Sequence, residues 1–306
     1  MVKRFIMKNE LVALALPGML VLFVFSYLPI PGLILAFKKY NFTQGMLGSP
    51  WVGFKNFEFF FTSQDAWRVT RNTIAYNLSF IVLTTVIAVT LAILLKEIDK
   101  RWLKLHQTAM FLPYFLSFVV VSYVALSLLD MGNGVTHANG YVNKLLESLG
   151  LPSVAWYQEA AYWPYILTLF HLWKALGFST LVYFAGLLGI DNSYYEAASI
   201  DGASKWQMTK SITIPLLMPL VIILFIVALG GIFHSDFGLF YFVPNNSSFL
   251  YSSTDVIDTY IYRSLINLGD IGMSTAIGLY QSVVGFIVVI SANALIRKIN
   301  SENSLW

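Results

Sequence analysis

Six long segments of the sequence contain almost no charged residue. A helix that crosses a bilayer needs about 20 mostly apolar residues, because each residue adds about 1.5 Å along a hydrocarbon core about 30 Å thick. Lys174 is the one charged residue within the six segments. They comprise residues 11–37, 72–95, 107–129, 162–190, 211–235 and 271–296. The sequence therefore predicts an all-α transmembrane protein with six spanning helices in a single domain, residues 1–306.

The composition agrees with a chain that is solvated mostly by lipid. Charged residues make up 11% of the sequence, whereas soluble domains contain about 25%. The net charge of +3 is small, which argues against nucleic acid as a partner. The sequence contains no cysteine, so disulfide frameworks, zinc–thiolate sites and cysteine nucleophiles are excluded.

The Lys and Arg residues between the spans predict how the chain is oriented. These residues are enriched in the cytoplasmic loops of membrane proteins. If the N-terminus is cytoplasmic, more of them fall in cytoplasmic segments than in outer ones, and the short segment 96–106 is distinctly basic. An even number of spans then places both termini in the cytoplasm.

Several classes of transporter and enzyme need residues that this sequence does not contain. None of the predicted spans contains Asp or Glu, although proton- and sodium-coupled transporters usually place a carboxylate there. The sequence has no P-loop pattern for ATP, and its four histidines show no metal-ligand spacing. We therefore expect no catalytic residue, no metal and no cofactor in this chain. A secondary solute transporter and a polytopic membrane enzyme remain as alternatives.

The segment 191–215, between the fourth and fifth predicted spans, has the pattern of two short helices. Ser-x-x-Glu begins at Ser193 and Ser-x-x-Gln begins at Ser204, and both have the spacing of a capping box. Gly202 can end the first helix in the left-handed conformation. Pro215 stands where the next membrane helix begins, which is a tolerated position. We expect an elbow on the cytoplasmic face.

The same segment carries a longer pattern. Glu-Ala-Ala, Asp-Gly-Ala and Ile-x-Leu-Pro follow one another as Glu196-Ala197-Ala198, Asp201-Gly202-Ala203 and Ile212-Thr213-Ile214-Pro215, with Ile214 in place of Leu. This pattern resembles the Glu-Ala-Ala loop of the permease subunits of binding-protein-dependent ABC importers. Other segments are similar to the polysaccharide and oligosaccharide permeases of the carbohydrate group, of the first-permease type. They are Val52-Gly53-Phe54-Lys55-Asn56-Phe57, Arg71-Asn72-Thr73, Phe111-Leu112-Pro113, Asp255-Val256-Ile257-Asp258-Thr259-Tyr260 and Ser304-Leu305-Trp306.

The resemblance implies a fold, partners and a function. It implies a six-helix ABC importer permease bundle with a cytoplasmic coupling-helix elbow, in the bacterial cytoplasmic (inner) membrane. The implied partners are a second homologous permease, two ATP-binding subunits that carry ATP and Mg, and an extracellular solute-binding protein. The implied function is uptake of oligosaccharides or polysaccharide fragments by alternating access, with an ABC permease for a non-sugar substrate as the alternative. The implied ATPase-coupling residues are Glu196, Ala197, Ala198, Asp201, Gly202 and Ala203.

A sugar pathway through lipid needs aromatic faces and polar groups inside the bundle. The fourth span offers His171, Trp173 and Lys174 within about one helical turn. An aromatic stripe on the third span, which includes Tyr114, Phe115 and Phe118, is a further candidate, although such stripes more often serve packing. Tyr280, a polar residue of the sixth span, is another candidate.

Lys174 lies near the middle of its span, where an ammonium group must find water, a partner or the substrate. An anionic sugar such as a uronic acid is one partner. A backbone carbonyl, or a carboxylate on a partner permease, is the other. The sequence does not decide between them.

Overall fold

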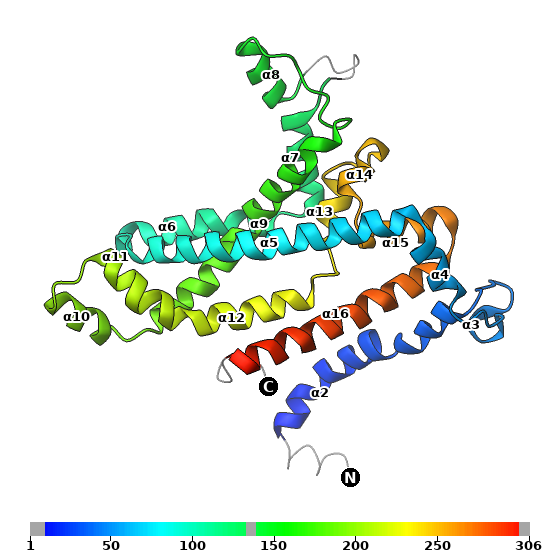
Figure 1. The fold of residues 1–306 in the computed structure, drawn as a ribbon, viewed down its shortest axis with the longest axis horizontal. Helices are drawn as coiled ribbons and strands as arrows, with labels where there is room; N and C mark the ends of the chain where they lie inside the picture. The colour runs from blue at the N-terminus through cyan, green and yellow to red at the C-terminus, as the bar shows by residue number, and fades with distance from the viewer. Residues whose placement is uncertain (1–9, 133–138, 300–306) are drawn as a thin grey trace. The chain divides into compact units, whose positions relative to one another are not determined.

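The computed structural model describes residues 10–132 and 139–299 and confirms the all-α prediction (Figure 1). Within these ranges the chain is helical, and one isolated antiparallel bridge joins Lys38 to Trp51. The Ser304-Leu305-Trp306 segment lies outside the described residues. The helices are α2 (Glu10–Leu22), η1 (Phe23–Tyr27), η2 (Ile30–Phe37), α3 (Gly45–Gly48), α4 (Lys55–Thr62), α5 (Gln64–Lys96), α6 (Lys100–Phe111), η3 (Leu112–Phe115), α7 (Phe118–Leu129), α8 (Tyr141–Ser148), η4 (Ala160–Tyr162), α9 (Trp163–Leu188), α10 (Ser193–Ile200), α11 (Lys205–Met208), η5 (Thr209–Thr213), α12 (Ile214–Gly230), α13 (Phe237–Phe242), η6 (Ser248–Leu250), α14 (Tyr251–Thr254), α15 (Ile257–Leu268) and α16 (Ile271–Ile299).

The chain divides into two compact units, one of residues 1–63 and 261–280 and the other of residues 64–260 and 281–306. In the first unit, polar side chains hold the loop after η2. The Asn56 amide donates to the carbonyl of Ala36 at 2.8 Å, and the Lys38 ammonium donates to the carbonyl of Leu47 at 2.7 Å. Backbone carbonyls that helices leave free are satisfied in this way.

Five helical segments in the described residues are long and apolar enough to cross a membrane. They are Leu14–Phe37, Gln64–Lys96, Ala160–Leu188, Lys205–Gly230 and Ile271–Ala294. They match five of the six predicted spans in position. The remaining predicted span, residues 107–129, falls on two helices that meet at an angle of 97°.

The bend in this span has a local cause. Pro113 has no amide hydrogen to continue the α-helical ladder of α6, and the chain passes through the short 3-10 helix η3. Ser117 is extended and its hydroxyl accepts a hydrogen bond from the Val120 amide, so it starts α7 as a new helix. We call residues 112–117 the break. It makes the segment a broken span or a re-entrant loop.

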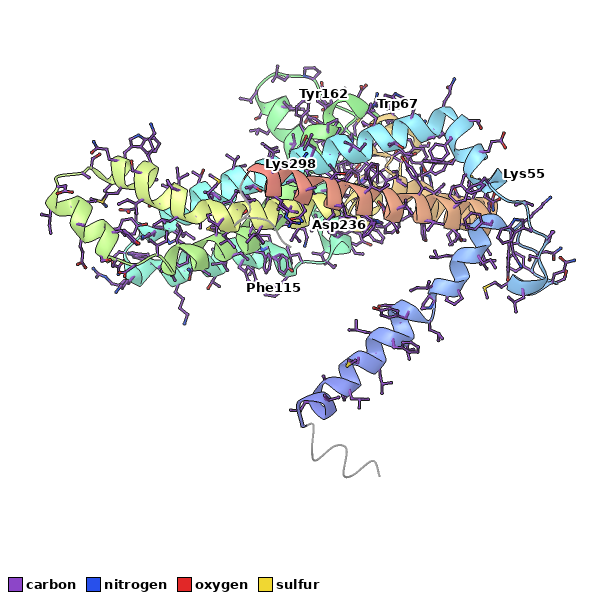
Figure 2. The ribbon with its side chains drawn as sticks, turned by 60° about the horizontal axis from the view of Figure 1, so that its bottom comes forward. Lys55, Trp67, Phe115, Tyr162, Asp236 and Lys298 are labelled. Atoms are coloured by element: carbon purple, nitrogen blue, oxygen red, sulfur yellow. The ribbon has the colours of Figure 1, made fainter. Side chains whose placement is uncertain are left out.

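The core of the second unit lies between α5, α9 and the helices that follow them. One apolar cluster contains Tyr76, Phe80, Trp163, Leu167, Phe170 and Phe240. Another contains Ala88, Ala92, Leu95, Tyr183, Phe184, Leu187 and Leu217. Small residues such as Ala88 and Ala92 let helices approach closely in a membrane. Large apolar side chains such as Trp67 and Phe115 remain exposed on the surface (Figure 2), as lipid-facing side chains do.

Candidate docking elbow and membrane cavity

The elbow, residues 191–215, contains the helix α10 and ends it as predicted. Gly202 has a φ of 77°, the left-handed conformation. The Ala203 amide donates to the Ala198 carbonyl at 2.9 Å, and the Gly202 amide donates to the Ser199 carbonyl at 3.1 Å. This pair of bonds is a Schellman motif, which satisfies the last carbonyls of the helix.

The start of α10 differs from the prediction. Ser193 is the first helical residue and does not cap the helix, so no Ser-x-x-Glu box forms with Glu196. Asp191 takes the capping role, because its carboxylate accepts a hydrogen bond from the Ser193 amide at 2.9 Å. This bond lowers the pKa of the Asp191 carboxyl. A capping box requires the Ser to precede the helix with extended backbone, and here the helix begins one residue early.

The second capping box is confirmed, but the helix that it starts is longer than predicted. The Ser204 amide donates to the Gln207 side chain at 2.7 Å, and the Gln207 amide donates to the Ser204 hydroxyl. From Lys205 the chain then stays helical as far as Gly230. The π-helical turn η5, Thr209–Thr213, lies just before Pro215. Pro215 has no amide hydrogen, and the wide turn accommodates that missing bond without ending the helix.

The elbow carries three large exposed side chains that are mostly apolar. The side chains of Ile200, Trp206 and Tyr194 are 87%, 73% and 55% exposed. Glu196, Ala197, Asp201 and Gly202 are exposed as well, and Ala198 and Ala203 are half-buried. Apolar side chains that gather on an exposed face mark an interaction surface.

Contacts to the end of α5 hold the elbow in place. The Lys96 ammonium lies 3.6 Å from the centroid of the Tyr195 ring, and the Tyr195 hydroxyl lies 3.0 Å from the Thr213 hydroxyl. Lys205 forms an ion pair with Glu97. These contacts join the elbow to the end of α5.

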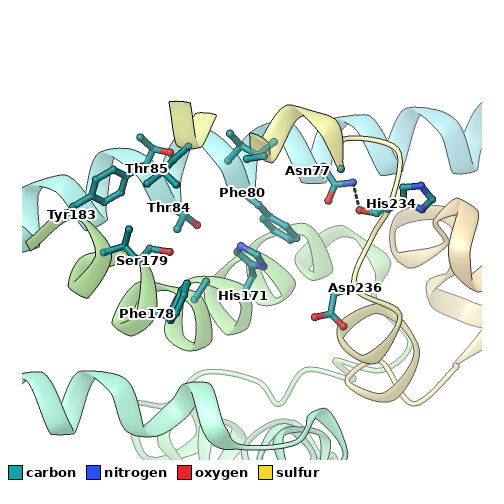
Figure 3. A pocket seen from close by; sticks show the side chains of 16 residues that line it. Asn77, Phe80, Thr84, Thr85, His171, Phe178, Ser179, Tyr183, His234 and Asp236 are labelled. Atoms are coloured by element: carbon teal, nitrogen blue, oxygen red, sulfur yellow. Dashed lines mark hydrogen bonds between the residues drawn. The ribbon is translucent and has the colours of Figure 1, made fainter. Parts of the chain in front are cut away.

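A cavity of about 420 Å³ lies between α5, α9, α12 and the segment that follows α12 (Figure 3). Its lining combines aromatic rings with polar groups. The aromatic rings belong to Phe80, Phe178 and Tyr183, and the polar side chains belong to Asn77, Thr84, Thr85, His171, Ser179, His234 and Asp236. The volume is within the range of small-molecule sites.

Two polar side chains in this lining have defined positions. The His171 ring stacks on the Phe80 ring, with 3.8 Å between centroids and 6° between planes. The Asn77 amide donates to the carbonyls of Ile232 at 2.8 Å and His234 at 3.2 Å. The predicted residue His171 therefore lies in the cavity, with its ring held against an aromatic neighbour (Figure 3).

The carboxylates next to the cavity are held by backbone amides. Asp236 caps α13 and accepts hydrogen bonds from the amides of Gly238 at 2.9 Å and Leu239 at 3.4 Å. Asp258 accepts a hydrogen bond from the Ser235 amide at 2.7 Å and lies 3.8 Å from the His234 ring nitrogen Nδ1. Burial raises the pKa of both carboxyls. These bonds fix the segment that forms one edge of the cavity.

Lys174 does not line the cavity. Its ammonium donates hydrogen bonds to the carbonyls of Pro113 and Tyr114, each at 3.2 Å, and to that of Leu116. It also lies 4.8 Å from the centroid of the Phe118 ring. The sequence left open which group pairs with the Lys174 ammonium. In the structure its partners are backbone carbonyls of this same chain.

The other predicted pathway residues also lie outside the cavity lining. Tyr114 stacks on Phe178, with 5.1 Å between ring centroids, and so contacts a residue of the lining. Trp173 packs against Phe170, and Phe115 is 73% exposed. In the first unit, Tyr280 packs against the rings of Phe60 and Phe61. Their place on a pathway stays a prediction.

Sequence reasoning missed most of the polar residues in the lining. A signal for them exists on α5, where Asn77 lies about two helical turns before the pair Thr84 and Thr85 within an apolar span. On α9, His171 and Ser179 are likewise about two turns apart. Polar residues that share one face of a membrane helix point to the bundle interior. No group of His, Cys, Asp or Glu suited to a metal ion is found among residues 10–132 and 139–299.

Comparison with known proteins identifies the family. A family model described as the inner membrane component of binding-protein-dependent transport systems matches residues 96–301. The chain belongs to this family. It is thus a multi-pass inner-membrane permease, as the sequence predicted.

Two relatives from Bacillus subtilis strain 168 extend the similarity over nearly the whole chain. Protein LplB is 32% identical over 290 residues, which cover 94% of this chain and 89% of LplB. The permease YteP, named for polygalacturonan/rhamnogalacturonan transport, is 29% identical over 300 residues, which cover 98% of this chain and 91% of YteP.

Solved structures agree with these relatives. A chain in the crystal structure of a bacterial ABC transporter that imports the acidic polysaccharide alginate superposes with a TM-score of 0.85 at 30% identity, covering 98% of this chain and 99% of that one. A second structure, of a bacterial alginate ABC transporter with an alginate pentasaccharide-bound periplasmic protein, gives a TM-score of 0.84 at 30% identity, covering 97% of each chain. The ABC importer permease fold is therefore confirmed.

Proposed function

We propose that this permease imports oligosaccharides or polysaccharide fragments by alternating access. It works with a second homologous permease, two ATP-binding subunits and an extracellular solute-binding protein. ATP and Mg bind to the ATPase subunits, and this chain catalyses no reaction. Both termini lie in the cytoplasm, which puts the elbow on the ATPase side of the membrane.

The lining of the cavity is the observation that carries this proposal. Sugars offer apolar C–H faces, which stack on aromatic rings, and hydroxyl groups, which exchange hydrogen bonds. The ring of Phe178, which is 46% exposed, supplies the first, and the hydroxyls of Thr84, Thr85 and Ser179 supply the second. Names and titles of the relatives, which include polygalacturonan and alginate transport, support the same substrate class.

The charge of the lining bears on which sugars pass. Asp236 carries a carboxylate, and the sixteen lining residues include no Lys or Arg. The ammonium of Lys174, within the fourth span, is directed to backbone carbonyls and lies outside the lining. The lining itself therefore provides no cationic side chain to pair with a uronate.

The elbow is the proposed ATPase-docking surface. Glu196, Ala197, Ala198, Asp201, Gly202 and Ala203 form the docking contact. Its exposed apolar side chains, above all Ile200 and Trp206, support a protein partner at this place. Closure of the ATPase dimer then moves the elbow, and the contacts of Lys96 and Lys205 pass the motion to α5.

Uptake by the complete complex in proteoliposomes tests the proposal. We expect ATP-dependent accumulation of oligosaccharides, with hydrolysis stimulated by the loaded binding protein. Neutral and uronate oligosaccharides of matched length are compared. Accumulation that persists with a hydrolysis-deficient ATPase and follows a proton or sodium gradient would establish a secondary transporter instead. Stimulation by lipids or peptides, but by no sugar, would establish a non-sugar permease.

A further inference from the structure

The break between α6 and α7 interrupts the helical hydrogen bonds in a segment predicted to lie in the membrane. Carbonyls at a helix end must be satisfied by other donors, because lipid offers none. At the break, the ammonium of Lys174 donates to the carbonyls of Tyr114 and Leu116, and also to that of Pro113, which the Leu116 amide binds as well at 3.2 Å. An ammonium group has three donors, and here each has an acceptor.

A second contact joins the same two segments one turn further along α9. Gly177 is buried, and a Cβ built on it would lie 2.6 Å from the Met110 carbonyl carbon and 2.9 Å from the Phe111 Cα. The backbone of α9 therefore lies directly against the end of α6. Only glycine allows this approach.

Lys174 and Gly177 are three residues apart and share one face of α9. We call this pair the latch. Lys174 binds the carbonyls of the break, and Gly177 allows the backbone at the end of α6 to approach α9 closely. The ring of Phe118, at the start of α7, lies 4.8 Å from the Lys174 ammonium and extends the contact to the far side of the break.

The position of the latch within the chain suggests its role. At one end α9 leads through Gly189 directly into the elbow, where α10 begins at Ser193. At the other end the break leads into α7. A bend of 97° with unsatisfied carbonyls would act as a hinge, and α7 would then move independently of α9.

We propose that the latch makes the break rigid, so that α7 follows α9 when the ATPase moves the elbow. Lys174 is thus a positioning residue for alternating access and not a ligand for the substrate. Testing this inference by uptake rests on the proposed import function. Testing it by distances between α7 and α9 does not depend on the substrate.

Distance measurements test the rigidity directly. The sequence contains no cysteine, so single cysteines can be introduced for spin labels without further changes. Tyr123 on α7 and Leu169 on α9 are 68% and 67% exposed and serve as label sites. In the assembled complex in nanodiscs, we expect the distance between these labels to be the same without nucleotide and with ATP trapped. A distance that changes between the two states in the native background overturns the proposal.

Substitutions at Lys174 test the role in transport. Lys174→Met keeps the apolar stem and removes the three donors. We expect uptake per ATP hydrolysed to fall by about tenfold, the usual size of a coupling between sites, and the label distance to broaden. The substrate concentration for half-maximal uptake should stay the same for neutral and uronate oligosaccharides. Lys174→Arg, which retains donors, should preserve most of the coupling, and Lys104→Met, on the exposed part of α6, should change nothing.

Each other outcome counts against the latch. A higher half-saturating concentration for uronates alone would make Lys174 a substrate ligand. Unchanged uptake per ATP in Lys174→Met, with a narrow label distance, would make its hydrogen bonds dispensable. If Lys174→Met fails to assemble, Gly177→Ala tests the same contact from the other side, because it forces the two backbones apart. A complex that transports no sugar would contradict the proposed function. The label distances would still show whether the latch holds α7 and α9 together.

Discussion

The elbow and the cavity are built in opposite ways. All the residues of the elbow come from one continuous stretch, and its two turns are closed by hydrogen bonds between residues at most five positions apart. The cavity takes its lining from α5, α9, α12 and the segment after α12, which are far apart in the sequence. The proposed docking surface is thus specified locally. The proposed sugar site depends on how helices that are distant in the sequence pack against one another.

The largest expected effect concerns the turn that shapes the elbow. Gly202 has a positive φ and open space around its Cα, so Gly202→Leu strains the backbone by about 1–2 kcal/mol without a steric clash. We expect binding of the ATPase and uptake to fall by about tenfold or more, with normal insertion in the membrane. Pull-down of the ATPase and uptake assays measure this.

Gly150 provides a matched control for that variant. It also has a positive φ and nothing within 4 Å of the position that a Cβ would take, but it follows α8. Gly150→Leu should leave ATPase binding intact. Equal loss of binding in both variants would mean that backbone strain, and not docking, is responsible.

The next largest effect concerns the cavity. His171→Phe keeps an aromatic ring for the stack on Phe80 but removes both ring nitrogens. The loss of one hydrogen bond to a sugar hydroxyl, about 1 kcal/mol, should raise the half-saturating substrate concentration by about fivefold. ATPase binding should not change. His106→Phe, on the exposed surface of α6, is the control; a cavity without a substrate role would give the same uptake curve for both variants.

A smaller effect is expected at the second turn of the elbow. Ser204→Ala removes the hydroxyl that caps α11, which costs about 1 kcal/mol. We expect weaker ATPase binding and an unchanged half-saturating substrate concentration, measured by pull-down and by uptake. Ser148, which is exposed at the end of α8 and lies outside the elbow, gives the control Ser148→Ala. If Ser204→Ala changed the half-saturating substrate concentration without changing ATPase binding, the elbow and the cavity would not have separate roles.

The smallest effect distinguishes the two regions by pH. Burial raises the pKa of Asp258, which holds the edge of the cavity. The contribution of Asp258 to the free energy of unfolding is therefore fully present below the ordinary Asp pKa. It is lost as the pH rises through the raised pKa of the folded protein. Asp258→Asn should reduce the fall in melting temperature between about pH 4 and about pH 7.

The carboxyl of the elbow should respond with the opposite sign. The hydrogen bond from the Ser193 amide lowers the pKa of Asp191, so its contribution is present above the ordinary Asp pKa and is lost as the pH falls through the lowered value. Asp191→Asn should change stability only slightly, because the side chain is exposed. Parallel pH profiles for the two variants would contradict the assignment of both carboxyls.

The same contrast explains what the sequence could predict. Spans follow from composition, and the Schellman end at Gly202 and the box at Ser204 follow from residues close in sequence. The box predicted at Ser193 was wrong because Asp191 offered a competing acceptor two residues earlier. The partner of Lys174 could not be foreseen, because its acceptors lie about sixty residues away and become available only where Pro113 interrupts α6.

The π-helical turn η5 has a mechanical consequence. Thr209–Thr213 form one turn that is wider than its neighbours, inside an otherwise continuous run from Lys205 to Gly230. One residue corresponds to about 100° of rotation in an α-helix. The extra residue of this turn therefore rotates Trp206 and the rest of α11 by about that angle about the helix axis, relative to an uninterrupted α-helix. The direction in which the exposed Trp206 side chain faces is thus set by this one turn.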